Sequence, residues 1–404
     1  MNKLTLKDLD LRGKRVLMRV DFNVPLDGGR VTDDMRIKSA VPSIRHVIDN
    51  GGRLVLMSHL GRPKGKRVPD MSLLPCVAVL KQLLGQDVRF VDDCIGPEVQ
   101  AAVNSLGDGE VLLLENLRYH GDETANNPEF ARQLAAFGDV FVNDAFGTVH
   151  RAHASTHGVT AFIDRCAAGF LVMKEMEYLD VALENPERPF IAILGGAKIS
   201  GKIDVISNLL PKVDKLIVGG GMAFTFFKAM GYEIGNSLLE MDKLELAGEL
   251  LSIGREKIVL PVDCLVSDVF DFPTRRIGPL NTVAVDAIPV TGIGLDIGPE
   301  TLRIIENLLT AARTIVWNGP MGVFEIDETA GGTFAVAEIM ARATTRGAVT
   351  IVGGGDSAAA IAKAGAASAV SHVSTGGGAS LEFLEGKTLP GVDALSDKPV
   401  AASS

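Results

Sequence analysis

The stretch FIAILGGAKISGK, residues 190–202, decides the fold class, because an apolar run leads directly into a turn rich in glycine and lysine. Five consecutive apolar residues predict a strand that is buried on both faces. The turn after it can offer backbone N–H groups and ammonium charges to a phosphate chain. It nearly matches the pattern GxxxxGK[ST] through Gly196, Gly201 and Lys202, but Ile203 replaces the hydroxyl residue that binds magnesium. We therefore favour a phosphate-binding turn of another kind; the structural alternative is a plain strand-to-helix turn with surface lysines.

Composition narrows the class of protein. The chain has 404 residues, 47% of them hydrophobic, which suits two or three domains. Its net charge of −10 disfavours a nucleic-acid or anionic-membrane partner, since either needs a broad basic surface. No apolar run approaches the roughly 18 residues of a membrane span, and the first residues lack the apolar core of a secretory signal. We therefore expect a cytoplasmic protein.

The cysteines are far apart in the sequence and form no CxxC pair. This spacing argues against a disulfide framework and against a cysteine metal site. We expect all of them to be buried as small hydrophobic residues: Cys76, Cys94, Cys166 and Cys264.

Short aliphatic runs alternate with helical stretches along most of the chain, which predicts parallel sheets covered on both faces, a doubly wound α/β architecture. Residues 170–188 have helical spacing and divide the runs into two groups, so we expect two domains joined by a helix. Residues 268–286 are more polar and are expected to be an irregular connection. The expected strands are residues 16–21, 54–58, 88–91, 111–114, 140–143, 190–194, 216–218, 258–262, 314–317, 349–352 and 370–373.

In open α/β sheets, ligands bind at the carboxyl ends of the strands. In the first half, the residues at these ends, together with Arg36 early in a helix, include four arginines and three histidines. Guanidinium groups bind phosphate and carboxylate oxygens in bidentate fashion, so the cluster predicts a site for a small polyanion. The alternative is that each arginine pairs with a nearby acid. The residues concerned are Asp21, Phe22, Asn23, Arg36, His59, Gly61, Arg62, Arg118, His150, Arg151 and His153.

The second half places mainly glycine after its strands, in the runs GGGMAF, WNGPMGVFE, GGGDSAAA and STGGGAS. Glycine lets the backbone approach a ligand, and the helix that follows directs its N–H groups at negative charge. These runs predict a nucleotide site.

Three other functions remain open on the residues alone. The run Gly353–Ala358 fits GxGxxA, but a dehydrogenase should carry an acid about twenty positions later, where Ser374 and Thr375 stand. His150, His153 and His157 have the spacing of a zinc-binding helix face, although glycines flank them closely. A non-catalytic nucleotide-binding protein would explain the glycine runs but would leave the arginines without a role.

Taken together, the motifs resemble those of the phosphoglycerate kinase family. Eight runs match in order and spacing: RVDFNVPL, SHLGRPKG, ENLRYH, NDAFGTVHRAHAS, LGGAKISGKI, WNGPMGVFE, GGGDS and STGGGAS. The resemblance implies a monomer that transfers a phosphoryl group between 1,3-bisphosphoglycerate and ADP, giving 3-phosphoglycerate and ATP, with Mg²⁺. It also implies a phosphoglycerate-binding domain at 1–170, a hinge helix at 171–188, a nucleotide-binding domain at 189–388, and a tail at 389–404 that returns to the first domain.

The resemblance also assigns roles to individual residues. Those implied for phosphoglycerate are Asp21, Phe22, Asn23, Arg36, His59, Leu60, Gly61, Arg62, Arg118, His150 and Arg151. Those implied for the nucleotide are Gly196, Lys198, Lys202, Gly219, Gly220, Gly294, Asn318, Pro320, Glu325, Gly353, Gly354, Gly355, Asp356 and Ser357. Arg36, Lys198, Asp356 and Gly377 are implied at the reacting centre, with Asp356 at the magnesium end. No role is implied for His153 or His157.

Overall fold

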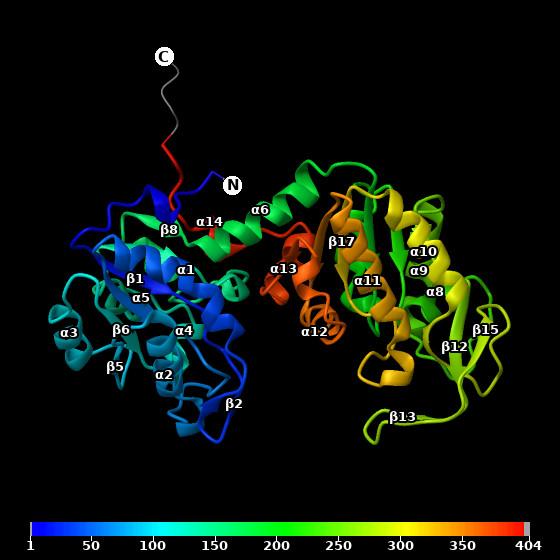
Figure 1. The fold of residues 1–404 in the computed structure, drawn as a ribbon, viewed down its shortest axis with the longest axis horizontal. Helices are drawn as coiled ribbons and strands as arrows, with labels where there is room; N and C mark the ends of the chain where they lie inside the picture. The colour runs from blue at the N-terminus through cyan, green and yellow to red at the C-terminus, as the bar shows by residue number, and fades with distance from the viewer. Residues whose placement is uncertain (1, 400–404) are drawn as a thin grey trace, which may run out of the picture. The chain divides into compact units, whose positions relative to one another are not determined.

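The computed structural model describes residues 2–399 and divides the chain into two compact units (Figure 1). Unit 1 consists of Met1–Glu177 and Thr388–Ser404, and unit 2 consists of Tyr178–Lys387. Each unit contains a parallel sheet of six strands with helices around it. The predicted doubly wound α/β class is therefore confirmed.

The unit 1 sheet has the strand order β5-β6-β4-β1-β7-β8, and all of its neighbours pair in parallel. The chain forms β4, β5 and β6 on one side of β1, with β5 at the edge, and then continues with β7 and β8 on the other side. The order thus reverses between β1 and β7, which is where an open α/β sheet binds ligands. The strands are β1 (Arg15–Arg19), β4 (Arg53–Met57), β5 (Arg89–Val91), β6 (Val111–Leu114), β7 (Val140–Asn143) and β8 (Cys166–Ala168).

The helices of unit 1 connect these strands, as a parallel sheet requires, except for α14, which belongs to the C-terminal segment. They are α1 (Met35–Asp49), α2 (Leu74–Leu84), α3 (Pro97–Asn104), α4 (Gly121–Thr124), α5 (Pro128–Ala135) and α14 (Pro390–Asp393). A small hairpin joins β2 (Leu26–Asp27) to β3 (Arg30–Val31). The 3₁₀ turns are η1 (Leu6–Asp8), η2 (Pro69–Met71), η3 (Leu117–Tyr119), η4 (Phe146–Thr148) and η5 (Gly158–Ala161).

The main sheet of unit 2 has the order β11-β10-β9-β17-β18-β19, again parallel throughout. Its order reverses between β9 and β17, so the GGAKISGK turn that follows β9 lies at the reversal point. Every residue of β9 is buried, as the apolar run predicts. The strands are β9 (Phe190–Leu194), β10 (Lys215–Val218), β11 (Ile258–Val259), β17 (Thr314–Asn318), β18 (Val349–Gly353) and β19 (His372–Val373).

The helices of unit 2 include α10 and α11, which pack side by side (Figure 1). The helices are α7 (Ile203–Leu209), α8 (Ala223–Ala229), α9 (Leu244–Ile253), α10 (Pro299–Ala311), α11 (Gly331–Thr345), α12 (Gly355–Lys363) and α13 (Gly378–Leu384). The 3₁₀ turns are η6 (Ile199–Gly201), η7 (Met241–Lys243), η8 (Asp327–Thr329) and η9 (Ala367–Ala369).

Unit 2 also carries antiparallel strands, and here the sequence-based expectation is wrong. The segment expected to be an irregular connection contains the hairpin β13 (Phe270–Asp271) to β14 (Arg276–Ile277), followed by β15 (Asn281–Ala284). Strand β15 pairs with β12 (Asp263–Ser267), which also pairs with β16 (Ile293–Ile297). Strands β13, β14 and β15 are short and partly exposed, so their sequence lacks the apolar runs that mark the parallel strands. Strands β12 and β16 are mostly buried.

Helix α6 (Phe170–Glu184) contains the boundary between the units, which falls between Glu177 and Tyr178. It ends just before Asn185-Pro186, because the residue before a proline is pushed out of helical geometry. The C-terminal segment contacts unit 1: the Gly391 N–H donates to the Val149 carbonyl oxygen at 2.8 Å. Within residues 2–399, no helix is long and apolar enough to cross a membrane.

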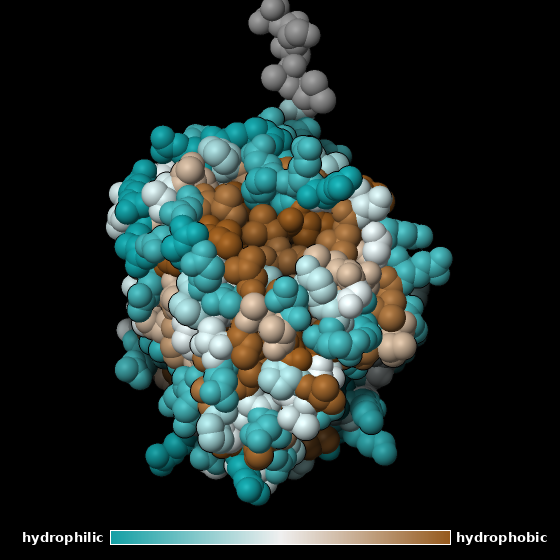
Figure 2. Space-filling model, turned by 90° about the vertical axis from the view of Figure 1, so that its right-hand side faces the viewer, coloured by the Kyte–Doolittle hydropathy of each residue, from teal (hydrophilic) through white to brown (hydrophobic). Residues whose placement is uncertain are grey.

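The side of the molecule drawn in Figure 2 gathers apolar side chains in a hollow ringed by polar ones. The exposed large apolar residues of unit 2 include Met241, Ile253 and Val262. The apolar surface of unit 2 therefore extends beyond its buried core.

Candidate functional site

A pocket of about 310 Å³ lies in unit 1, among loops that follow the strands of its sheet. Three of the four arginines singled out in the sequence line it: Arg62, Arg118 and Arg151. The fourth, Arg36, is not among the lining residues; its Nη1 lies 2.9 Å from the Asp21 carboxylate. Lys64, Gly65, Thr124 and His153 complete the lining, and of these only His153 was noted in the sequence.

The charge of this pocket is not neutralised by acidic side chains of the protein. Within residues 2–399, the guanidinium groups of Arg62 and Arg151 make no ion pair and no hydrogen bond. The alternative considered from the sequence, in which each of the four arginines pairs with an acid, therefore holds only for Arg36. Arg118 donates through Nη1 to the Gly61 carbonyl oxygen at 2.9 Å, but its buried Nε has no acceptor in the protein. Burial, reinforced by nearby arginines, lowers the pKa of Arg118 to about 10. An anion is the ligand that such a pocket favours.

The loops beside the pocket are held by amide side chains. Asn23 Oδ1 accepts the Gly61 N–H at 2.8 Å, which ties the loop after β1 to the loop after β4. Asn116 accepts the Leu60 N–H at 3.2 Å and donates to its carbonyl oxygen at 2.7 Å. The side chains of Phe22 and Leu60 are buried in the unit 1 core, so only their backbone is available to a ligand.

Burial, with nearby arginines, keeps His59, His150 and His153 neutral. Nδ1 of the buried His59 lies 3.0 Å from Nη2 of Arg19, and burial moves the pKa of His59 well below its usual value. Burial also lowers the pKa values of His150 and His153 to about 4. The buried Nδ1 atoms of His150 and His153 make no hydrogen bond to the protein.

The zinc-binding helix considered for the histidine triplet does not form. Residues 149–157 are turns and irregular structure, so His150, His153 and His157 do not share a helical face. His153 lies near the buried Glu123, with 3.8 Å between Nδ1 and Oε1. His157 Nδ1 lies 3.5 Å from the Asn126 amide nitrogen instead.

Unit 2 has a pocket of about 330 Å³ at the reversal point of its sheet. Lys202 Nζ donates to Asn318 Oδ1, while the buried Asn318 Nδ2 makes no hydrogen bond to the protein. Burial lowers the pKa of Lys202, and the Asp356 carboxylate opposes that shift. Lys198 is exposed and has no ion pair within the described residues. The pocket is lined by Gly195, Gly196, Ala197, Lys198, Lys202, Asn318, Gly319, Pro320, Gly354, Gly355, Asp356, Ser357, Gly377, Gly378 and Leu381.

Glycine is required where the loops after β9 and β17 touch. A Cβ on Gly195 would lie 2.1 Å from the Pro320 carbonyl oxygen, and Gly319 has a φ of +100°. Neither position accepts a larger residue without moving backbone. Glycine at position 195 is therefore needed for the close packing of the two loops as well as for access of a ligand to the backbone.

The turn before α12 brings further N–H groups to this pocket. Gly354, with a φ of +91°, precedes the helix, and Asp356 lies exposed in its first turn. The buried Ser357 Oγ accepts the Gly319 N–H at 2.6 Å, so this hydroxyl braces the loop after β17. A helix N-terminus placed in this way attracts a phosphate.

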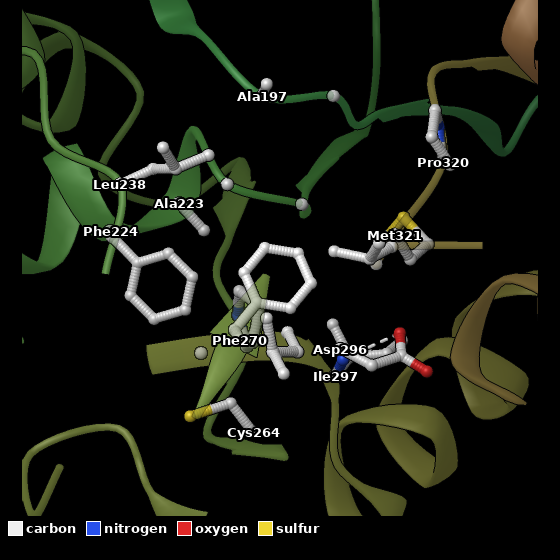
Figure 3. Close-up of a pocket in the computed structure, with 18 of the residues that line it drawn as sticks. Ala197, Ala223, Phe224, Leu238, Cys264, Phe270, Asp296, Ile297, Pro320 and Met321 are labelled. Carbon is white, nitrogen blue, oxygen red and sulfur yellow. Dashed lines mark hydrogen bonds between the residues drawn. The ribbon is translucent and has the colours of Figure 1, made fainter. Parts of the chain in front are cut away.

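An apolar pocket, also of about 330 Å³, adjoins the phosphate-type pocket and shares Gly196, Ala197, Pro320 and Asp356 with it. In Figure 3 the rings of Phe224 and Phe270 and the side chain of Met321 approach the cavity from three different segments. Of the residues singled out in the sequence, Gly196, Gly220, Gly294, Pro320, Glu325 and Asp356 line it. Gly219 and Gly353 line neither pocket; a Cβ on Gly219 would lie 2.2 Å from Met321 Cε.

Sequence reasoning missed the apolar side of this pocket. Phe224, Leu238, Phe270 and Met321 are apolar residues in helical, loop or hairpin segments, and nothing in their pattern distinguishes them from core residues. It also missed Asp296, whose two carboxylate oxygens accept the Gly332 and Ile297 N–H groups at 2.6 and 2.9 Å. Burial raises the pKa of Asp296 to about 7.

Comparison with known proteins identifies the family. The family model described as phosphoglycerate kinase matches residues 6–387. Phosphoglycerate kinase of Chlorobium phaeovibrioides is 59% identical over 98% of this chain and 100% of its own, and that of Chlorobaculum tepidum is 59% identical with the same coverage. The solved phosphoglycerate kinase of Coxiella burnetii is 42% identical with a TM-score of 0.88, over 97% of this chain and 98% of its own. That of Pyrococcus horikoshii is 33% identical with a TM-score of 0.82, over 97% and 98%. The chain therefore belongs to the phosphoglycerate kinase family.

Proposed function

We propose that the chain catalyses the reversible transfer of a phosphoryl group between 1,3-bisphosphoglycerate and ADP, giving 3-phosphoglycerate and ATP, a step of glycolysis. The observation that carries the proposal is the division of the pockets. Unit 1 holds arginines without acidic partners, and unit 2 holds a glycine-lined pocket joined to an apolar one. This division suits one small polyanion and one nucleotide.

Phosphoglycerate would bind in the unit 1 pocket. Its phosphate would accept hydrogen bonds from Arg62, Arg118 and Arg151, whose guanidinium groups have no acid to neutralise them. Arg36 is held towards Asp21 by its ion pair at 2.9 Å, near the loop after β1. A charge-assisted contact to phosphate is worth about 1.5–3 kcal/mol, so three of them would dominate the affinity.

The nucleotide would bind in unit 2, with its base in the apolar pocket between Phe224 and Met321 and its ribose near the exposed Glu325. The two pockets share residues, so a nucleotide would continue from the apolar pocket into the phosphate-type pocket. There Lys202, the N-terminus of α12 and the backbone near Gly377 would face its phosphates.

Magnesium is expected to accompany the nucleotide, and the residues present fit it. Asp356 offers an exposed carboxylate at the edge of both pockets, and Mg²⁺ in kinase sites is held by one or two carboxylates plus nucleotide phosphates. Bound Mg²⁺ would neutralise charge on the phosphates. Asp356 would otherwise repel them, so its placement there supports the assignment.

The reaction needs no general base. The nucleophile in the ATP-consuming direction is the carboxylate of 3-phosphoglycerate, which is already ionised at neutral pH. His150 and His153, with pKa values of about 4, are neutral there and add no positive charge. Arg36 and Lys198 would stabilise the charge on the oxygens of the transferring phosphoryl group, and catalysis would rest on positioning and charge.

The substrates would bind to different units, so transfer requires the units to approach and exclude water from the acyl phosphate. We propose α6, which contains the unit boundary, as the hinge. Small-angle scattering should give a smaller radius of gyration with both substrates than with either alone. An unchanged radius would count against hinge closure. The protein is expected to be a cytoplasmic monomer, and size-exclusion chromatography would measure its oligomeric state.

The activity is tested by measuring ADP release from MgATP with and without 3-phosphoglycerate, beside the Arg36→Ala variant. We expect release that depends on 3-phosphoglycerate and collapses in the variant. Release without 3-phosphoglycerate, or none at all, would contradict the proposal and favour a nucleotide-binding protein.

A further inference from the structure

A group of metal-ligating side chains lies in unit 1 outside the arginine pocket: Asp93, Cys94 and His120. One ligand atom from each residue lies within 4.8 Å of the other two. Asp93 and Cys94 follow β5, while His120 follows η3, so the fold brings together two segments that are 26 positions apart in the sequence. This distance along the chain is why the cysteine spacing gave no sign of the group.

The three side chains are held in place by contacts around them. Asp93 Oδ1 lies 2.7 Å from His120 Nε2 and accepts the Cys94 N–H at 2.6 Å. The Asp93 carbonyl oxygen accepts the Glu115 N–H at 3.2 Å, and the His120 ring packs against Phe130 with 5.4 Å between centroids. The contacts to Glu115 and Phe130 come from outside the group, and such contacts orient the ligands of a metal.

Access to the group is open on one side. The side chains of Asp93 and His120 are 47% and 28% exposed, whereas Cys94 is 1% exposed and forms the floor. A cation can therefore reach the carboxylate and the imidazole from solvent, and the sulfur lies within 4.8 Å of the ligand atoms of both. Burial, with Asp93 next to it, raises the pKa of the Cys94 thiol, and a bound cation would offset both effects.

We propose that Asp93, Cys94 and His120 bind one thiophilic divalent cation, Zn²⁺ in the first instance. Thiolate, imidazole and carboxylate are the ligands that Zn²⁺ takes in proteins, and a water would complete a tetrahedron. Mg²⁺ prefers oxygen ligands only, so the sulfur selects against the ion that accompanies the nucleotide. On binding, the thiol proton leaves to solvent, and the cation replaces the hydrogen bond between His120 Nε2 and Asp93 Oδ1. His120 then coordinates through Nε2 with its ring proton on Nδ1.

The competing explanation is that the contact between Asp93 and His120 only ties the two loops together. That explanation requires the carboxylate and the imidazole but not the thiol. Replacing Cys94 therefore distinguishes the metal site from a simple tie between loops. A serine at this position leaves the hydrogen bond between Asp93 and His120 in place and removes the sulfur ligand.

The test uses the full chain, freed of metal with a chelator and titrated with Zn²⁺ against a chromogenic chelator. We expect one Zn²⁺ per chain and at least about tenfold weaker binding in Cys94→Ser and in His120→Asn. Cys166→Ser is the matched control, because Cys166 is also a buried free thiol of unit 1. Co²⁺ gives a second readout: a thiolate-to-cobalt absorption band should be present in the control and absent in Cys94→Ser.

Circular dichroism shows whether each variant is folded; if Cys94→Ser does not fold, His120→Asn with its intact thiol decides the question. The proposal is overturned if the unmodified chain takes up no stoichiometric Zn²⁺. It is also overturned if folded Cys94→Ser and His120→Asn bind Zn²⁺ as tightly as the control. Neither result bears on the kinase activity, which is assayed separately.

Discussion

Units 1 and 2 share one architecture, a parallel sheet of six strands, but they place different chemistry at its carboxyl ends. In unit 1 those ends carry cationic side chains, and the pocket is lined by Arg62, Arg118 and Arg151. In unit 2 they carry glycine and backbone N–H groups, with an antiparallel insertion that adds an apolar wall. The comparison teaches that sheet topology fixes where a ligand binds, while the loops fix which ligand it is.

The largest expected effect tests whether each unit contributes a cation to the reaction. Arg36→Ala in unit 1 and Lys198→Ala in unit 2 should each lower turnover by about 10³-fold, since a cation on the transferring phosphoryl group is worth about 4 kcal/mol of barrier. Lys38→Ala is the matched control, because its ion pair with Asp34 is largely exposed and should contribute little. Steady-state kinetics decide the matter: a rise in the nucleotide KM with turnover unchanged would contradict this role.

A second change tests the glycine side of the comparison. Gly195→Ala should lower the stability of unit 2 by about 3 kcal/mol, because its Cβ would lie 2.1 Å from a backbone oxygen that cannot move freely. Gly201→Ala, in the same turn, has no atom within 4 Å of its Cβ and should change stability by less than about 0.5 kcal/mol. Calorimetric unfolding midpoints compare the two; equal midpoints would mean that Gly195 is not constrained by packing.

The two units should also differ in their response to pH, through particular side chains. Burial raises the pKa of Asp296 in unit 2 to about 7 from 3.8, so the folded state holds a proton that the unfolded state releases between these values. The contribution of protonated Asp296 to the free energy of unfolding is full below pH 4 and is lost as the pH rises to 7, by up to about 4 kcal/mol. Asp296→Asn should abolish this slope. It leaves one backbone N–H without its acceptor, which shifts the midpoint equally at every pH, so only the slope is diagnostic.

His153 in unit 1 should show the opposite sign. Its pKa is lowered to about 4 from 6.5, so unfolding takes up a proton as the pH falls through this window. The stability linked to neutral His153 is full above pH 6.5 and is lost towards pH 4, by about 2 kcal/mol after allowing for solvent near the ring. His153→Gln should reduce the acid sensitivity of the midpoint. A variant as acid-sensitive as the original chain would show that His153 takes up its proton without unfolding.

Much of this arrangement was predictable from the sequence. Continuous apolar runs such as residues 190–194 predicted the positions of the parallel strands, because a strand that is buried on both faces consists mainly of apolar residues. The positions directly after those runs identified four residues that line the pockets, because the carboxyl ends of parallel strands meet at one edge of a sheet. These residues are Arg62, Arg118, Arg151 and Lys202.

The rest could not be predicted, for physical reasons. The strands β12 to β16 are short and partly exposed, and their pairing depends on tertiary contacts. Phe270 reaches the apolar pocket only because a hairpin carries it there. The group Asp93, Cys94 and His120 depends on two loops that meet only in the folded chain.

The division of ligands between the units is tested most directly by calorimetric titration of 3-phosphoglycerate and of ADP, each into the unmodified chain, Arg118→Ala and Lys202→Ala. We predict that Arg118→Ala weakens 3-phosphoglycerate binding by about 30-fold or more and leaves ADP binding within about twofold, and that Lys202→Ala does the reverse. If folded Arg118→Ala binds 3-phosphoglycerate normally, or if both variants lose both ligands equally, the assignment of one substrate to each unit is wrong.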